Sequence, residues 1–195
     1  EAAKLGLTEK DALSLSGYAQ AEMGNLEAAR EQFERAQDTE GLAFLALKKG
    51  DYKKVIELAE SAPSPSGYML TVKAQALLRL GKTEEALQSL QSAVTQPAAE
   101  WQQAEAYNHL GRVEQLLGNL DNAATAFASA QKLDALNISV LTNYSEVLRE
   151  KGDLEKAAEL LETAKTRKID DSLTRLLLEQ IQRDTAAAKE LERRE

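Results

Sequence analysis

The sequence has no cysteine, one histidine, one tryptophan and only three prolines among its 195 residues. The absence of cysteine excludes disulfide bonds, thiolate metal sites and a cysteine nucleophile, and it fits a reducing or an oxidising compartment equally well. The lone histidine, His109, would need a nucleophile and an orienting group beside it to act as a base, and the sequence suggests neither. We therefore expect no catalytic residue, no bound metal and no cofactor.

Acidic residues outnumber basic ones by 32 to 24, and long apolar runs are absent. The formal net charge is −8 and the isoelectric point is near 4.9, which argues against a nucleic-acid-binding surface. No apolar run approaches the length of a membrane span, so we expect no direct membrane insertion.

The chain begins with EAAKLGLTEK, and we interpret residues 1–9 as the end of a truncated preceding helix. Localisation stays open between a bacterial periplasm or envelope and the cytoplasm.

One short pattern recurs five times. The stretch LLGNLDNAATAFASA, from Leu116 to Ala130, has counterparts at four other places, each with alanine or valine five residues after a glycine and alanine twelve residues after it. The anchoring glycines are Gly24, Gly50, Gly81, Gly118 and Gly152. Seven residues before them stand the small residues Gly17, Ala43, Ala74, Gly111 and Ser145. Internal repetition of this kind decides the architecture before any local motif does.

Each position of the pattern has a physical cause. The glycine adopts the left-handed conformation that ends a helix, and Asn25, Asp51, Asn119 or Asp153 follows as a cap for the next helix. In the third copy we expect Thr83 to supply the cap instead. The small positions are three or four residues apart, so they share one helical face and let neighbouring helices approach closely. The repeated unit is therefore a pair of antiparallel helices stacked on the next pair.

These residues resemble the tetratricopeptide repeat family, whose units of about 34 residues carry L-G before the turn and A-x-x-x-F after it. The stretch YNHLGRVEQLLGNLDNAATAFASA, from Tyr107 to Ala130, has nearly the whole pattern. The resemblance implies an all-α, right-handed α-solenoid of helix-turn-helix units, with about eleven helices. We predict one superhelical domain over residues 1–195, with repeats at 10–38, 39–66, 67–103, 104–137 and 138–171 and a capping helix at 172–195.

Irregular junctions interrupt the repeat. Between the first two copies we expect Asp38 or Thr39 to cap the next helix directly. The prolines of SAPSPSG, from Ser61 to Gly67, predict an extended connection. Pro97 predicts an early start to a long helix that carries Trp101.

The final segment predicts one long helix with Asp170 or Asp171 as its cap. Its partial apolar stripe consists of Leu173, Leu177, Ile181, Ala188 and Leu191. Two hypotheses stay open for this helix. It is a solvating cap, which repeat arrays require, or it forms a partner or homo-oligomer face, because Leu176 and Leu178 widen the apolar arc.

In the family, the first helices line a concave groove that commonly binds an extended or helical segment of a partner. By that register the fourth and fifth repeats present Glu105, Asn108, Arg112, Gln115, Ser139, Thr142, Glu146 and Arg149. We predict that the partner-binding groove includes Tyr18, Phe44, Leu47, Tyr68, Leu78, Trp101, Asn108, Arg112 and Arg149. Aromatic anchors favour its N-terminal half and an apolar or amphipathic ligand, although Phe44 and Trp101 fit equally well as space-filling residues.

The resulting hypothesis is a non-catalytic scaffold for protein–protein interaction that binds a partner peptide or helix. Compositional style points to a bacterial envelope assembly system such as pilus biogenesis or polysaccharide export, by analogy alone. Two alternatives stay open. One is a regulatory or targeting segment of a larger enzyme, and the other is a structural array that associates with itself.

Overall fold

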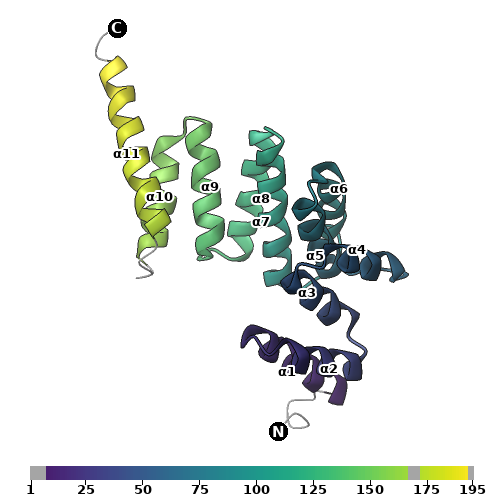
Figure 1. Cartoon of the computed structure of the whole chain (residues 1–195). Helices are drawn as coiled ribbons and strands as arrows, with labels where there is room; N and C mark the ends of the chain where they lie inside the picture. The colour runs from purple at the N-terminus through teal and green to yellow at the C-terminus, as the bar shows by residue number, and fades with distance from the viewer. Residues whose placement is uncertain (1–7, 167–171, 193–195) are drawn as a thin grey trace. The chain divides into compact units, whose positions relative to one another are not determined.

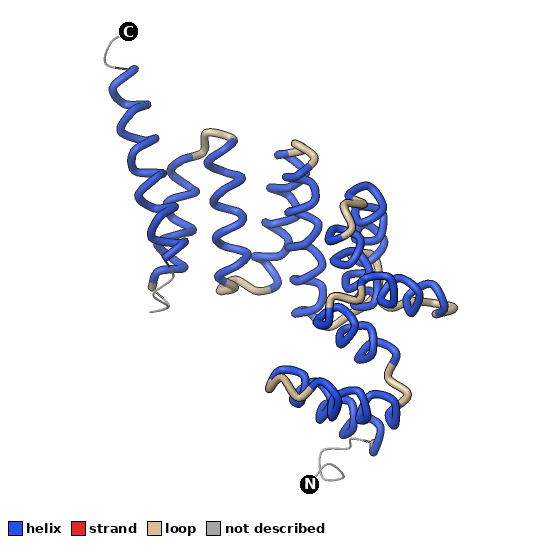
Figure 2. The backbone as a smooth tube through the Cα atoms, viewed as in Figure 1, coloured by secondary structure: helices blue, strands red, loops and turns tan. Residues whose placement is uncertain are grey.

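The computed structural model describes residues 8–166 and 172–192, and all regular structure in these ranges is α-helical (Figures 1 and 2). The chain packs as two compact units, Glu1–Pro97 and Ala98–Glu195. Unit 1 contains α1 (Glu9–Glu22), α2 (Leu26–Ala36), α3 (Thr39–Lys49), α4 (Tyr52–Ser61), α5 (Gly67–Arg79) and α6 (Thr83–Ala93). Unit 2 contains α7 (Glu100–Leu116), α8 (Leu120–Leu133), α9 (Ile138–Glu150), α10 (Leu154–Lys165) and α11 (Ser172–Glu192).

Consecutive helices form hairpins within each unit. In unit 1 the pairs α1–α2, α3–α4 and α5–α6 stack in chain order, and α3 also contacts α1 and α5. In unit 2 α7 pairs with α8 and α9 with α10, while α11 lies against α10 and α9 (Figure 1). The predicted fold class, an all-α solenoid of stacked helix-turn-helix units ending in a long capping helix, is confirmed by this order in the described residues.

The turns between paired helices follow the predicted chemistry in part. All five repeat glycines have positive φ angles, from +74° at Gly81 to +84° at Gly152, the left-handed conformation that a side chain disfavours. Asp51 and Asp153 cap the following helices, accepting hydrogen bonds from the backbone N–H of Lys54 and Lys156.

The other predicted turn caps are wrong. Asn25 and Asn119 form no cap bond with the next helix. Their side-chain amides instead donate to Gln20 Oε1 at 2.8 Å and Glu114 Oε2 at 2.9 Å, at the end of the preceding helix. In the third turn α6 already begins at Thr83, so Lys82 occupies the cap position without a side-chain bond.

Phenylalanine rings fill the gaps that glycines leave between helices. A Cβ atom on Gly17 would lie 2.6 Å from Phe33 Cε1, and one on Gly41 would lie 2.1 Å from Phe33 Cδ1. In unit 2 the same relation holds between Gly111 and Phe127, where the distance would be 2.8 Å. Both rings are fully buried. In the first and fourth repeats, the small residue seven positions before the turn thus makes room for the phenylalanine nine positions after it.

The irregular junctions also have clear outcomes. Asp38 caps α3 by accepting from the Gly41 N–H at 2.8 Å, as predicted. The connection from α4 to α5 bends over residues 62–64 and has extended backbone at its two ends, Ala62 and Ser66, and Ser66 caps α5. Helix α7 is long and carries Trp101, but it begins at Glu100 and not at Pro97, because the backbone of Ala99 is still extended.

Helix α11 buries one edge and leaves the other in solvent. Ile181 is 1% exposed and Leu178 is also buried in the unit 2 core, whereas Leu176 and Leu191 are 56% and 65% exposed. Leu191, a member of the predicted apolar stripe, is therefore not buried against unit 2. The side chains of Leu173 and Ala188, the predicted caps Asp170 and Asp171, and residues 1–7 of the predicted leading fragment lie outside the described residues. Thr8 caps α1, so Glu9 begins that helix.

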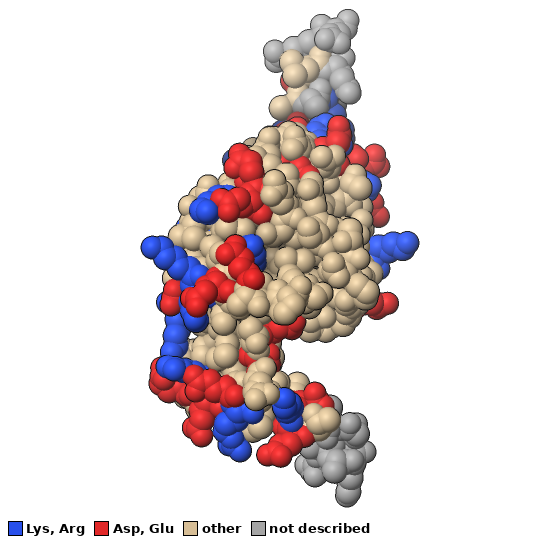
Figure 3. Space-filling model, turned by 90° about the vertical axis from the view of Figure 1, so that its right-hand side faces the viewer, with Lys and Arg blue, Asp and Glu red and all other residues tan. Residues whose placement is uncertain are grey.

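Three properties of the described residues bear on function. No helix in the described part of the chain is both long and apolar enough to cross a bilayer. Within the same residues no group of three His, Asp or Glu side chains is placed to hold a metal ion. The face drawn in Figure 3 has acidic and basic side chains intermixed beside a wide area that has neither.

Candidate functional site

The aromatic residues of the predicted groove in unit 1 form a cluster in which the rings pack mainly against one another and against Phe33. The ring of Tyr18 lies edge-on to Phe33, with centroids 4.9 Å apart, and is tilted against Phe44 at 5.2 Å. Tyr18 and Phe44 are both half-buried against the core around Phe33. These contacts bury ring surface that a ligand would otherwise cover.

Tyr18 also has polar neighbours from two other helices. Burial is the main cause that raises the pKa of its hydroxyl, and the nearby Tyr68, Asp38 and Glu40 raise the pKa further. A side-chain hydrogen bond with Tyr68 acts in the same direction. The structure thus brings together Tyr18, Phe44 and Tyr68 of the predicted groove, and their role in partner binding stays a prediction.

Leu47 and Tyr68 contact a second cluster around Val55 and Met69. Leu78 is half-buried near the end of α5.

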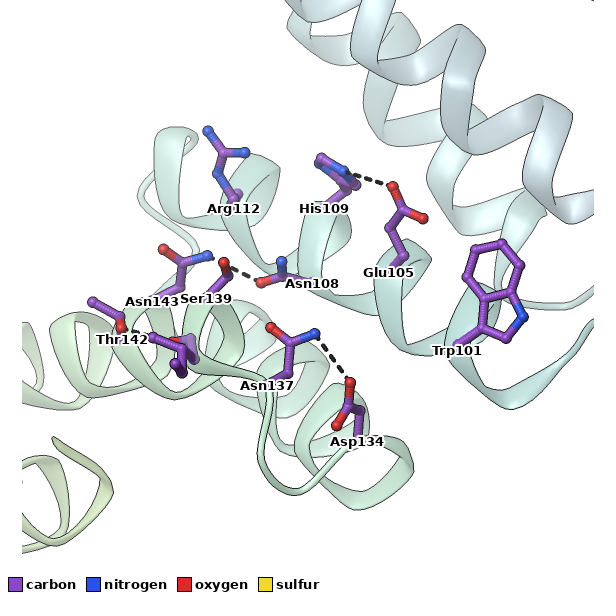
Figure 4. A pocket seen from close by; sticks show the side chains of 11 residues that line it. Trp101, Glu105, Asn108, His109, Arg112, Asp134, Asn137, Ser139, Thr142 and Asn143 are labelled. Atoms are coloured by element: carbon purple, nitrogen blue, oxygen red, sulfur yellow. Dashed lines mark hydrogen bonds and ion pairs between the residues drawn. The ribbon is translucent and has the colours of Figure 1, made fainter. Parts of the chain in front are cut away.

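Unit 2 contains a polar pocket of about 580 Å³ (Figure 4). It lies between one face of α7, the loop after α8 and the first turns of α9. Its lining residues are Trp101, Glu105, Asn108, His109, Arg112, Asp134, Asn137, Ile138, Ser139, Thr142 and Asn143. Three of the predicted site residues, Trp101, Asn108 and Arg112, therefore share one cavity.

Helix geometry explains which side chains of α7 face this pocket. Trp101, Glu105, Asn108 and Arg112 follow one another at intervals of four, three and four residues, so they project from one stripe of the helix. The preceding junction matters because it lets α7 start at Glu100 and include Trp101. The indole is 59% exposed, which leaves an apolar surface available at the pocket.

Hydrogen bonds fix several polar groups of the pocket. The Asn143 amide donates to Asn108 Oδ1 at 3.0 Å and thereby joins α9 to α7. The Asn137 amide donates to Asp134 Oδ2 at 3.1 Å and stiffens the loop before α9 (Figure 4). Asn137 also caps α9. The two asparagine bonds leave further amide and hydroxyl groups of the lining for a ligand.

Charged groups occupy different positions around the pocket. His109 Nε2 lies 3.7 Å from Glu105 Oε1, while His109 Nδ1 is buried and has no hydrogen-bond partner among the described residues. The exposed Arg112 forms no ion pair within that part of the chain. Arg149, the remaining predicted site residue, does not line the pocket, because its guanidinium pairs with Asp184 of α11 at 3.3 Å.

The sequence prediction misses several lining residues. The family register places Glu105, Ser139 and Thr142 on the groove face, but the predicted site does not include them. Asp134 and Asn137 lie at the junction between α8 and α9, where helical periodicity carries no information. Asn143 follows Asn108 by 35 residues, and the same interval joins Gln115 to Glu150 and Arg149 to Asp184. That interval is the signal that pairs these positions.

Comparison with known proteins points consistently to one repeat family. One model described as "Tetratricopeptide repeat" matches residues 11–40 and 104–135, and a second model with the same description matches residues 70–92. A search of curated proteins finds no match.

Solved structures show the same fold. One is titled as the APC/C hetero-tetramer Cut9-Hcn1, with a TM-score of 0.78 and 16% identity over 88% of this chain. This chain spans only 36% of that protein's length. Pseudomonas aeruginosa pilF gives a TM-score of 0.76 at 20% identity, covering 94% of this chain and 89% of its own. A Thermus thermophilus structure titled as a thermophilic TPR protein gives 0.69 at 22%, covering 88% and 98%.

Proposed function

The chain belongs to the tetratricopeptide repeat family, and we propose that it is a non-catalytic scaffold that binds a partner protein segment in the unit 2 pocket. The observation that carries this proposal is the combination of an exposed indole with convergent amide and hydroxyl groups in one cavity. Sites that bind ligands commonly pair apolar contact surface with a few placed polar groups.

The lining chemistry suits an extended peptide. A peptide backbone offers one N–H donor and one carbonyl acceptor per residue, and the side chains of Asn108, Asn143 and Ser139 supply both kinds of partner. The indole of Trp101 supplies the apolar contact that dominates many interfaces. The Asn108–Asn143 bond and the caps of α9 hold these groups in place before binding, which lowers the entropic cost of association.

The proposal differs in emphasis from the sequence prediction, which centres binding on the aromatic residues of unit 1. It keeps Trp101, Asn108 and Arg112 of the predicted set and assigns Tyr18 and Phe44 mainly to packing, because their rings contact one another and Phe33. A ligand site at Tyr18 and Tyr68 stays a prediction. Binding measured with Tyr18→Ala plus Tyr68→Ala, set against Trp101→Ala plus Asn108→Ala, distinguishes the two units.

A direct test uses peptides selected on the purified chain from a displayed random library. Trp101→Ala should weaken the selected peptides about tenfold, since loss of an interface anchor costs about 1–2 kcal/mol or more. Leu116→Ala is the matched control, because Leu116 lies on the same helix, is 71% exposed and does not line the pocket. Equal affinity for the wild type and the Trp101 variant would place the binding site elsewhere.

The cellular pathway is a finer proposal. An envelope assembly system such as pilus biogenesis or polysaccharide export fits the compositional style, and the likeness to pilF, at 20% identity, is a likeness of fold alone. Loss of a surface polymer or fibre after the coding region is deleted, restored by the wild type but not by Trp101→Ala, is the result expected under this proposal.

A further inference from the structure

The unit 2 pocket has acidic and basic side chains at different places along its lining. Trp101 and Glu105 lie in the first turns of the helix, and Arg112 lies two turns beyond Glu105 on the same stripe (Figure 4). Asp134 adds a second carboxylate from the loop after α8. The pocket therefore has an aromatic residue and two carboxylates in its lining, together with one guanidinium at the far end of the α7 stripe.

The aromatic and acidic groups suit a basic side chain. An exposed indole is the best of the aromatic faces for a Lys or Arg cation, and 59% of Trp101 is exposed. Among the described residues, the Asp134 carboxylate accepts a hydrogen bond only from the neutral side-chain amide of Asn137, and no Lys or Arg pairs with it. The carboxylate charge thus lacks a cation inside this part of the chain. The net charge of −8 also favours approach of a basic partner.

Arg112, in contrast, suits an acidic side chain of the ligand. Its guanidinium is exposed at the pocket and has no acidic partner among the described residues, whereas Arg149 is engaged by Asp184. A guanidinium binds a carboxylate through two parallel hydrogen bonds when geometry allows. An acidic side chain of the ligand is therefore the complementary group for Arg112.

Helix α7 fixes the distance between Trp101, which suits a basic side chain, and Arg112, which suits an acidic one. Trp101 and Arg112 are eleven residues apart in the sequence, which corresponds to about 16 Å along a helix that rises 1.5 Å per residue. An extended peptide covers that distance in about five residues, at about 3.3 Å for each. We infer that the pocket selects an extended segment with a Lys or Arg at Trp101 and an Asp or Glu about five residues away at Arg112. This inference rests on the proposed function and specifies the chemistry of its ligand.

The test uses the peptides selected on the full chain, resynthesised with acetylated and amidated ends so that no terminal charge contributes. Their affinity is measured for the wild type, Asp134→Lys and Arg112→Glu, with Leu116→Ala as the control. Each peptide is also made with its basic residue changed to Glu or its acidic residue changed to Lys. Circular dichroism checks that every variant keeps its helices, and Asp134→Asn serves as a milder substitution near the end of α8.

We expect the selected peptides to share opposite charges about five residues apart. Exchange of the basic residue for Glu should weaken binding about tenfold, because it removes a cation–π contact and an ion pair together. Arg112→Glu should weaken the original peptide about fivefold and restore the affinity of the peptide whose acidic residue is Lys. Added salt should reduce these differences, since the charged groups are partly exposed.

Two other outcomes overturn the inference in distinguishable ways. Peptides that depend on Trp101 but show no charge pattern and respond to neither charge reversal would overturn the inference and leave the proposed function standing. Peptides that bind equally well to Trp101→Ala, or a library from which none is enriched, would overturn the proposed function and the inference with it.

Discussion

Gly111 and Phe127 show how a single residue sets the separation of two helices. A Cβ on Gly111 would lie 2.8 Å from Phe127 Cε1, a distance at which the ring must move. Gly111→Leu should therefore destabilise the protein by about 1–3 kcal/mol through overpacking. Ala128→Leu on the exposed side of α8 is the control and should change stability by less than about 0.5 kcal/mol. Chemical denaturation measures both.

A double-mutant cycle makes that prediction specific. Phe127→Ala alone should cost about 3–5 kcal/mol because it leaves a cavity. If the two side chains compete for one space, the double variant should be more stable than the sum of the single effects by at least about 1 kcal/mol. Additive effects would mean that Gly111 is required for another reason.

Tyr18 is a residue whose titration reports its surroundings. Its pKa in the folded chain is raised, mainly by burial, so the folded state keeps the phenolic proton at pH values where the unfolded chain loses it. The associated stability is present below about pH 10 and is lost as the pH rises above that value. The wild type should lose up to about 1.4 kcal/mol per pH unit more than Tyr18→Phe in that range. Parallel stability curves for the two proteins would contradict the assignment.

At the scale of elements, α11 illustrates how an array ends. It follows α9 at an interval of 35 residues, as the Arg149–Asp184 bond shows, and so occupies the place of a further first helix. Buried Leu141 and Tyr144 of α9 correspond at this interval to Leu176, which is 56% exposed, and to the exposed Glu179. One of these two positions in α11 is therefore polar and both are exposed, so no further helix covers them in the described part of the chain, which suits a cap.

Replacement of a side chain by alanine should affect stability differently at the two edges of α11. Ile181→Ala removes a fully buried side chain from the unit 2 core and should cost about 2–5 kcal/mol. Leu191→Ala removes an exposed side chain of similar size on the same helix and should change stability by less than about 0.5 kcal/mol. Thermal unfolding followed by circular dichroism compares them. A large effect at Leu191 would indicate that a second copy or another segment covers that edge.

The helices can be predicted from the sequence more completely than the pocket can. Glycine at the turns and a small column before them predict the helices and their pairing, because a positive φ angle and a close approach leave few alternatives at those positions. The caps are less predictable, because a side chain at the turn can bond to either of the two helices that it joins. Asn119 bonds to Glu114 of the preceding helix and not to the backbone of the next one. The pocket depends on the loop at Asp134 and Asn137, whose path no periodicity encodes.

At the scale of the whole molecule, the sequence predicts one continuous domain, while the folded chain packs as two compact units. The lone tryptophan allows a test, because Trp101 belongs to unit 2 whereas circular dichroism reports the helices of both units. In a repeat array, stability is a sum of local terms. We predict that denaturant unfolding followed by fluorescence and by circular dichroism gives different midpoints. Coincident curves would support a single cooperative domain instead.

Trp101 also gives the most direct measurement of the central claim, that a partner segment binds in the unit 2 pocket. The chain is titrated with a selected peptide that lacks tryptophan, and indole emission and acrylamide quenching are recorded while calorimetry reports binding. The account predicts a shift of the emission to shorter wavelength and reduced quenching that saturate with the heat of binding, because the peptide covers the 59% of Trp101 that is exposed. Calorimetric binding that leaves emission and quenching unchanged would contradict the account.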